Sequence, residues 1–114
     1  MPDLGKRLPA SPASRFLLGN FDATTGQVQE EKATVVFNQP VNRFVAALQG
    51  YDLSYAGGED HHLGQLLVEL FSDRTPGTNN AVDVTVRYLL RDASGNIDDP
   101  YQGAVGVHVI ADVG

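Results

Sequence analysis

Apolar and polar residues alternate along much of this chain with a period of two, which is typical of β-strands. The clearest run covers residues 81–92. Its apolar face holds Val82, Val84, Val86, Tyr88 and Leu90, and its polar face holds Asp83, Thr85, Arg87 and Arg91. A second run near the C-terminus turns Val105, Val107 and Val109 inward and Gly106 and His108 outward. We predict a strand in each run.

Three further segments have weaker strand patterns. Residues 33–37 place Ala33, Val35 and Phe37 on one side, and Pro40 then ends the strand because it has no amide hydrogen to donate. Residues 42–55 are apolar on both faces, which predicts a strand buried on both sides. Residues 65–72 alternate between an apolar face and a face of mixed polarity, a pattern that does not fit a helical period.

Turn-forming residues separate these segments, in "DATTGQ", "NQPVN", "AGGEDHHLG", "RTPGTNN" and "DASGNIDDP". About six strands joined by polar turns, with no amphipathic helix, predict an all-β protein with a six-stranded antiparallel β-sandwich. We assign this domain to residues 15–114. Pro9 and Pro12 interrupt regular hydrogen bonding, so residues 1–14 are expected to form an extended proline-rich arm.

Composition narrows the classes of function. The chain has 114 residues, enough for one domain, and its formal net charge is −6 without any Lys/Arg cluster, which argues against a nucleic-acid partner. It has no cysteine, which excludes disulfides and thiolate zinc sites. No apolar run is long enough to span a membrane or to form the core of a signal peptide, so we expect a soluble protein and leave its compartment open.

Enzyme signatures are missing from the sequence. It contains no nucleophile elbow, no phosphate-binding glycine loop, no HExxH motif and no serine with a local reason for activation. We therefore expect a protein that is not an enzyme.

The order of the predicted strands resembles that of the H-type lectin domain, from Arg15 to Val113. The resemblance rests on five stretches: "RFLLGNFD", "ATVVFNQPVNRFVAALQGYDLSY", "LLVELFS", "VDVTVRYLL" and "YQGAVGVHVIA". Within them, the family's Val/Ile-x-Phe strand with its proline turn corresponds to Val35–Pro40. Its hydrophobic strand ending in an Asp motif corresponds to Val45–Asp52, and its closing strand to Val105–Ile110.

This resemblance implies a six-stranded antiparallel sandwich that forms a homotrimer or homohexamer and binds galactose or N-acetylgalactosamine between protomers. Family sites use an acidic residue near the first loop, an arginine at the start of the fourth strand, an aromatic–histidine pair ending the fifth, and a tyrosine beyond. The chain departs from this pattern. Gln65 stands in place of the arginine, Leu90 and Arg91 stand in place of the aromatic–histidine pair, and there is no tryptophan.

We therefore expect a rearranged carbohydrate site, because sugar binding needs an aromatic ring for stacking and polar groups for the hydroxyls. Glu30 or Glu31 would supply the acid, Gln65 and Arg91 the hydrogen-bond donors, and Tyr101 the ring. The alternative is a structural or docking subunit of a phage-tail-like or other particle, which keeps the lectin fold without binding sugar. The expected partner is accordingly a glycan or a particle protein.

Several large apolar residues fall on the predicted outward faces, where a subunit interface would cover them. We expect this oligomer interface to contain Leu67, Phe71, Leu89 and Ile110.

We expect no cofactor. Two loops nevertheless contain residues that offer a weak alternative, a metal site. In "GGEDHHLG", His61 and His62 lack further nearby ligands, but a three-fold axis could gather them and bind an ion. In "DASGNIDDP", the alternate oxygen ligands suggest a calcium loop, yet Ile97 replaces its glycine. A long hairpin loop is the simpler interpretation, with calcium binding through Asp98 and Asp99 as the alternative.

Overall fold

The computed structural model describes residues 6–24, 27–55, 63–92 and 101–114, with only the backbone described at 6–9, 21–24, 63–64 and 91–92. These residues form seven strands. The strands are β1 (Lys6–Ala10), β2 (Ala13–Thr24), β3 (Gln29–Phe37), β4 (Val41–Tyr55), β5 (Leu63–Arg74), β6 (Ala81–Asp92) and β7 (Tyr101–Val113). No helix in the described part of the chain has the length and apolar character needed to cross a membrane.

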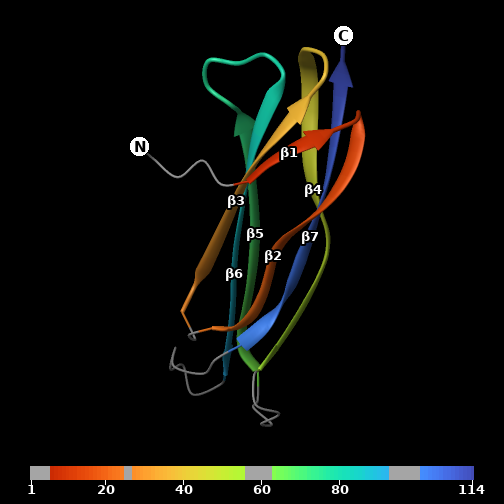
Figure 1. Cartoon of the computed structure of the whole chain (residues 1–114). Coiled ribbons are helices and arrows are strands. Elements are labelled where there is room, and N and C mark those ends of the chain that lie inside the picture. The colour runs from red at the N-terminus through yellow and green to blue at the C-terminus, as the bar shows by residue number, and fades with distance from the viewer. Residues whose placement is uncertain (1–5, 25–26, 56–62, 93–100) are drawn as a thin grey trace.

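The strands form two sheets that face each other (Figure 1). One sheet has four strands in the order β1-β3-β6-β5, and the other has three in the order β2-β7-β4. Strands β2 to β7 pair only antiparallel with one another, whereas β1 joins β3 in parallel. The predicted all-β fold with six antiparallel strands in a sandwich is therefore confirmed, and β1 is an addition to it.

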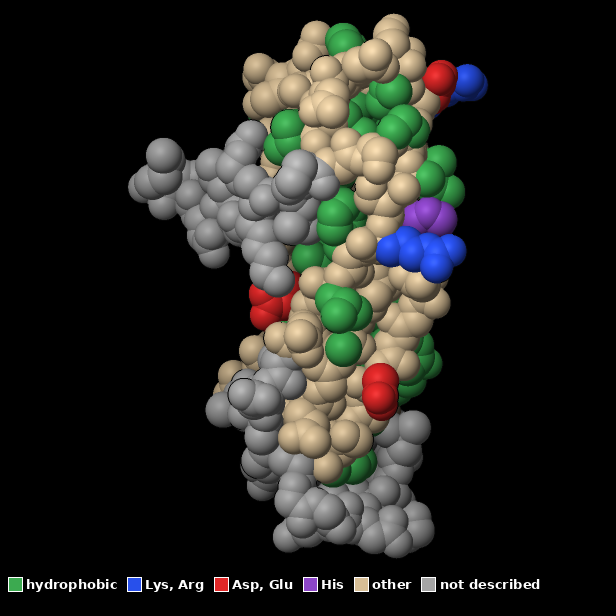
Figure 2. All heavy atoms as spheres, turned by 45° about the vertical axis from the view of Figure 1, so that its right-hand side comes forward, with side chains coloured by type: hydrophobic (Ala, Val, Ile, Leu, Met, Phe, Trp, Pro, Cys, Tyr) green, Lys and Arg blue, Asp and Glu red, His purple; other side chains and the backbone are tan. Residues whose placement is uncertain are grey.

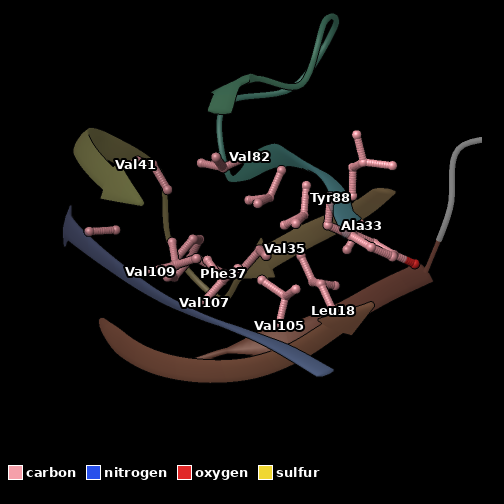
Figure 3. Close-up of a cluster of buried hydrophobic side chains, with 14 of the residues drawn as sticks. Leu18, Ala33, Val35, Phe37, Val41, Val82, Tyr88, Val105, Val107 and Val109 are labelled. Atoms are coloured by element: carbon pink, nitrogen blue, oxygen red, sulfur yellow. The ribbon is translucent and has the colours of Figure 1, made fainter. Parts of the chain in front are cut away.

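The core lies between the two sheets and follows the predicted alternation (Figure 3). Every inward residue predicted for β6 is buried, and Val105, Val107 and Val109 of β7 have no exposed surface. Burying a valine or leucine side chain stabilises the fold by about 1.5–3 kcal/mol relative to exposing it. The two central strands thus supply much of the hydrophobic stabilisation, because each lies between two neighbours in its own sheet.

Strand β1 lies within the segment predicted as an extended arm. It pairs with β3 from Lys6, opposite Ala33, to Ala10, opposite Phe37. Pro9 is tolerated there because β1 is the edge strand of the four-stranded sheet, where a missing amide hydrogen disturbs no second neighbour. The next strand, β2, begins at Ala13 and belongs to the other sheet.

The prediction that residues 42–55 are buried on both faces is wrong. These residues form β4, which pairs only with β7 and is an edge of the three-stranded sheet. Val45 is 53% exposed and Leu48 is 41% exposed. The sequence pattern was misleading because it does not show that β4 lacks a second neighbour, which leaves Leu48 accessible at the edge, or that nothing in the described chain covers Val45 on the outer face.

Arg74 at the end of β5 joins the two sheets at one end of the sandwich. Its guanidinium Nη1 donates a hydrogen bond of 2.7 Å to the carbonyl oxygen of Val41, and Nη2 lies 3.5 Å from that of Asn42. The same guanidinium lies 5.9 Å from the centre of the Phe44 ring. Arg74 therefore anchors the start of β4 against the opposite sheet.

Candidate functional site

The middle of the outer face of the three-stranded sheet contains several residues with little or no side chain. Cross-strand pairing brings Ala47 beside His108, Gly50 beside Gly106, and Asp52 beside Ala104. Leu17 of β2 pairs with Gly106 from the other side. The middle of this face is therefore open backbone with the larger Leu17 side chain along one border.

A β-bulge in β4 shapes the same region. The pairing with β7 shifts between Leu48 and Gly50, so that Gln49 is an extra residue on β4. Bulges of this kind bend a strand, redirect the side chains that follow, and are frequent beside functional sites. After the bulge, Asp52 pairs with Ala104 on the outer face, whereas Tyr51 pairs with the buried Val105 on the other side of the strand.

Small side chains and the bulge together leave a surface pocket of about 360 Å³. Its lining residues are Leu17, Gln49, Gly50, Tyr51, Asp52, Ala104 and Gly106. Leu17 is 58% exposed on the outer face and offers apolar surface to a ligand, and Tyr51, which is 48% exposed, borders the pocket from the edge strand. Gln49 adds an amide and Asp52 a carboxylate. The pocket thus combines an apolar wall with directional polar groups and is bordered by a tyrosine of the edge strand, a combination typical of small-molecule sites.

Gly103 holds β7 against the segment of β4 that carries Asp52. Its φ angle is +151°, and a Cβ atom at this position would overlap the carbonyl oxygen of Asp52. Only glycine permits both the backbone conformation and the close approach of the two strands. Gly106 has a different role, because a Cβ there would meet the Gln49 side chain at 3.7 Å, an ordinary contact inside the pocket.

Two basic side chains occupy the next row of the same face. Arg15 of β2 pairs with His108 of β7, which pairs in turn with Ala47. This row lies two residues from the row of Leu17, or about 7 Å along the strand. Arg15 and His108 are consequently neighbours of the pocket without belonging to its lining.

Tyr101, predicted as the stacking ring of the sugar site, is fully buried. Its hydroxyl donates to the carbonyl oxygen of Gln27 at 2.7 Å and contacts that of Tyr88 at 3.1 Å. The Tyr88 and Tyr101 rings meet edge to face with their centres 6.4 Å apart. Burial raises the pKa of Tyr101 to about 12. In this chain Tyr101 packs in the core, and its ring face is not open to a ligand.

The predicted acids and donors are only partly brought together. Glu30 faces Arg87 across the outer side of the four-stranded sheet and lies 3.6 Å from Lys32, whereas Glu31 points inward. The Glu31 carboxylate accepts a long hydrogen bond of 3.4 Å from the Tyr88 hydroxyl. Burial, followed by the charge of Glu31, raises the pKa of Tyr88.

Gln65 and Arg91 pair across β5 and β6. Gln65 is exposed, but only the backbone of Arg91 is described. Both lie in the four-stranded sheet, away from the pocket in the three-stranded sheet.

The four predicted interface residues lie on two different faces. Leu67 pairs with Leu89, and Phe71 lies further along β5 on the same outer side of the four-stranded sheet, whereas Ile110 belongs to the three-stranded sheet. Leu89 is already buried in the single chain, while Phe71 is 49% exposed and Ile110 is 43% exposed. The structure does not bring these residues into one continuous row.

The weak metal alternatives at His61, His62, Asp98 and Asp99 lie outside the described residues. Within the described ranges, no three histidine or acidic side chains are grouped closely enough to hold a metal ion.

The pocket residues Gln49, Tyr51 and Asp52 were missed by the sequence reasoning. A signal was present in "LQGYDLSY", where a glycine interrupts an apolar strand and is followed by an aromatic and an acidic residue. A glycine within a strand often marks a bulge. Which face those residues occupy depended on the pairing with β7, which no local pattern specifies.

A comparison of the chain with known proteins gives no match to a family model, a curated protein or a solved structure. The functional argument therefore rests on the chemistry of the pocket.

Proposed function

We propose that this protein is a non-catalytic carbohydrate-binding module that acts as an oligomer. The observation that carries the proposal is the pocket at the β4 bulge, whose lining brings Gln49 and Asp52 together with Tyr51, an exposed residue of the edge strand. The earlier expectation of a ring at Tyr101 is replaced by Tyr51, because Tyr101 is buried.

The chemistry of a sugar ring suits this lining. A pyranose has apolar C–H surfaces that pack against an aromatic face, and hydroxyl groups that need directional hydrogen-bond partners. A carboxylate accepts hydrogen bonds that are stronger than those between neutral groups, and an amide both donates and accepts. The small residues Gly50, Ala104 and Gly106 leave room for the ring to approach the backbone.

Oligomerisation would compensate for a weak single site. A rigid assembly with several pockets raises avidity without any new contact to the sugar. We place the interface on the outer face of the four-stranded sheet, where Phe71 is exposed, because this choice leaves the pocket on the other sheet free. The oligomer is proposed as a homotrimer or homohexamer, as the resemblance to H-type lectins implies.

The test is a glycan-array screen on protein whose mass has been measured by light scattering in the same buffer. We expect the intact oligomer to bind a set of glycans, and Gly106→Val to abolish this binding by filling the pocket. Ala13→Val is the matched control, because Ala13 is on the same outer face two rows away, paired with Ile110. Retained binding in Gly106→Val would contradict the site.

Light scattering tests the interface separately. Phe71→Asp should reduce the mass to that of a single chain, whereas Ile110→Asp on the opposite sheet should leave the oligomer intact. Loss of the oligomer in Ile110→Asp alone would place the interface on the three-stranded sheet instead.

A second candidate function is a structural or docking subunit of a particle, without sugar binding. It is favoured by the exposed apolar residues Leu17, Val45 and Ile110 on the outer face of the three-stranded sheet, which a protein partner would bury. An intact oligomer that binds no glycan on the array would support this alternative and contradict the first.

A further inference from the structure

The charge of the pocket limits which saccharides it can accept. Among the described residues that line it, Asp52 is the only one with a side chain that is charged at neutral pH. The remaining lining residues are a tyrosine, a glutamine, a leucine and small residues. The whole chain also carries a formal net charge of −6. A ligand in this pocket therefore meets negative charge both locally and at long range.

We infer that the pocket selects neutral or amino-bearing saccharides and rejects rings that carry a carboxylate, sulfate or phosphate. This inference rests on the proposed carbohydrate-binding function and specifies its ligand class. An anionic group next to Asp52 would face a like charge, while a hydroxyl or an ammonium group would donate a charge-assisted hydrogen bond to the same carboxylate.

The selectivity also depends on how the backbone around the carboxylate is held at the bulge. Gln49 is the inserted residue, and Gly103 holds the backbone of Asp52 close to β7. Asp52 therefore belongs to a segment whose backbone is held by the sheet. A held backbone limits how far the carboxylate can move aside to accommodate a second negative group, which favours discrimination.

Arg15 provides a competing positive charge on this face and lies beside His108. They lie in the adjacent row, about 7 Å away along the strands, and do not line the pocket. A glycan long enough to reach this row could place an acidic group there. The inferred preference therefore concerns only the sugar ring that occupies the pocket. A substitution of Arg15 distinguishes that ring from an acidic group bound in the adjacent row.

The experiment compares matched glycan pairs that differ only in an acidic group, with the full chain in its natural oligomeric state. Each neutral or amino-bearing glycan is presented beside its sialylated or sulfated counterpart at the same ionic strength. We expect binding to the neutral member to exceed binding to the acidic member by about ten-fold or more, the size expected for one hydrogen bond to a charged group.

Two substitutions identify the responsible carboxylate. Asp52→Asn should weaken neutral-glycan binding and reduce the discrimination between members of a pair. Asp112→Asn is the matched control, since it removes the same charge from the same strand pair, where Asp112 pairs with Arg43. Equal effects of both substitutions would attribute the selectivity to net charge and overturn the role of Asp52.

The outcomes separate this inference from the proposed function. Stronger binding to the acidic members, lost in Arg15→Gln, would overturn the inference while leaving a carbohydrate-binding protein. No binding to any glycan by an intact oligomer would overturn the proposed function itself. The comparison of matched pairs on the unsubstituted chain remains decisive even if Asp52→Asn does not fold.

Discussion

The two sheets share the same inner design but differ on their outer faces. The outer face of the four-stranded sheet carries charged pairs, with Arg87 between Glu30 and Glu69 and its guanidinium 3.6 Å from Glu69. The middle of the three-stranded sheet has Gly50 beside Gly106 and Asp52 beside Ala104 instead. Figure 2, which turns the right-hand side of Figure 1 forward, shows hydrophobic side chains scattered among backbone and uncharged polar side chains, with a histidine and a few charged groups.

This difference shows that residues with small side chains on a surface can be as informative as residues with large ones. Long charged side chains cover the backbone of a sheet, whereas glycine and alanine leave it accessible. The pocket, the bulge and the exposed Tyr51 all occur on the sheet with the small residues. The predictions below test how far stability and ligand chemistry are divided between the two faces.

The largest effect is expected at Gly103. Substitution to alanine forces a Cβ atom into the Asp52 carbonyl and a side-chain-bearing residue into a φ of +151°. The free energy of unfolding should fall by about 2–4 kcal/mol. Chemical denaturation measures this change. Gly50→Ala is the control, because a Cβ at Gly50 meets nothing within 4 Å, and an equal loss there would refute the steric explanation.

Arg74→Ala should lower the free energy of unfolding by about 1.5–3 kcal/mol. The substitution removes a 2.7 Å hydrogen bond from a charged donor to the Val41 carbonyl and the contact with the Phe44 ring. Arg43→Ala is the comparison, because among the described residues Arg43 has an exposed ion pair with Asp112, and its loss should cost no more than about 0.5 kcal/mol. Denaturation curves with similar losses for both would show that Arg74 does not join the sheets.

Alkaline pH should destabilise the fold through Tyr101. Its pKa is about 12 in the folded chain against 10.0 for a free tyrosine, so the unfolded state loses its proton first and stability falls as pH rises above 10. This residue alone should contribute a loss of about 1 kcal/mol between pH 9 and 11. Denaturation at several pH values should show a shallower decline in Tyr101→Phe. An unchanged slope would mean that Tyr101 is not the group responsible.

The smallest effect is expected for Glu69→Gln on the charged face of the four-stranded sheet. The Glu69–Arg87 pair is partly exposed, so its loss should change the free energy of unfolding by less than about 1 kcal/mol. Thermal and chemical unfolding in low and high salt would measure it. A larger, salt-sensitive loss would mean that this face stabilises the fold more than the comparison of the two sheets implies.

Local pattern was sufficient for much of the fold. The alternation in residues 81–92 and 105–109 identified the central strands and their buried faces, because a period of two assigns each side chain to one side of its strand. The proline turn after Phe37 was visible for the same kind of local reason. The candidate site was harder to predict from the sequence. Gln65 and Tyr101 were selected by their positions in a resemblance, but Gln65 lies away from the pocket and Tyr101 lies inside the core.

Alternation along the chain thus determined that this is an all-β protein and which residues of the central strands form its core. Only the tertiary structure decided that β4 is an edge strand, that Tyr101 is enclosed, and that Phe71 and Ile110 lie on opposite sheets. The physical reason is that a strand's sequence specifies its two faces, whereas strand order and register arise from pairing between distant segments. The pocket at Tyr51 and Asp52 belongs to that second level, because it exists only where the β4 bulge meets the small residues of β7.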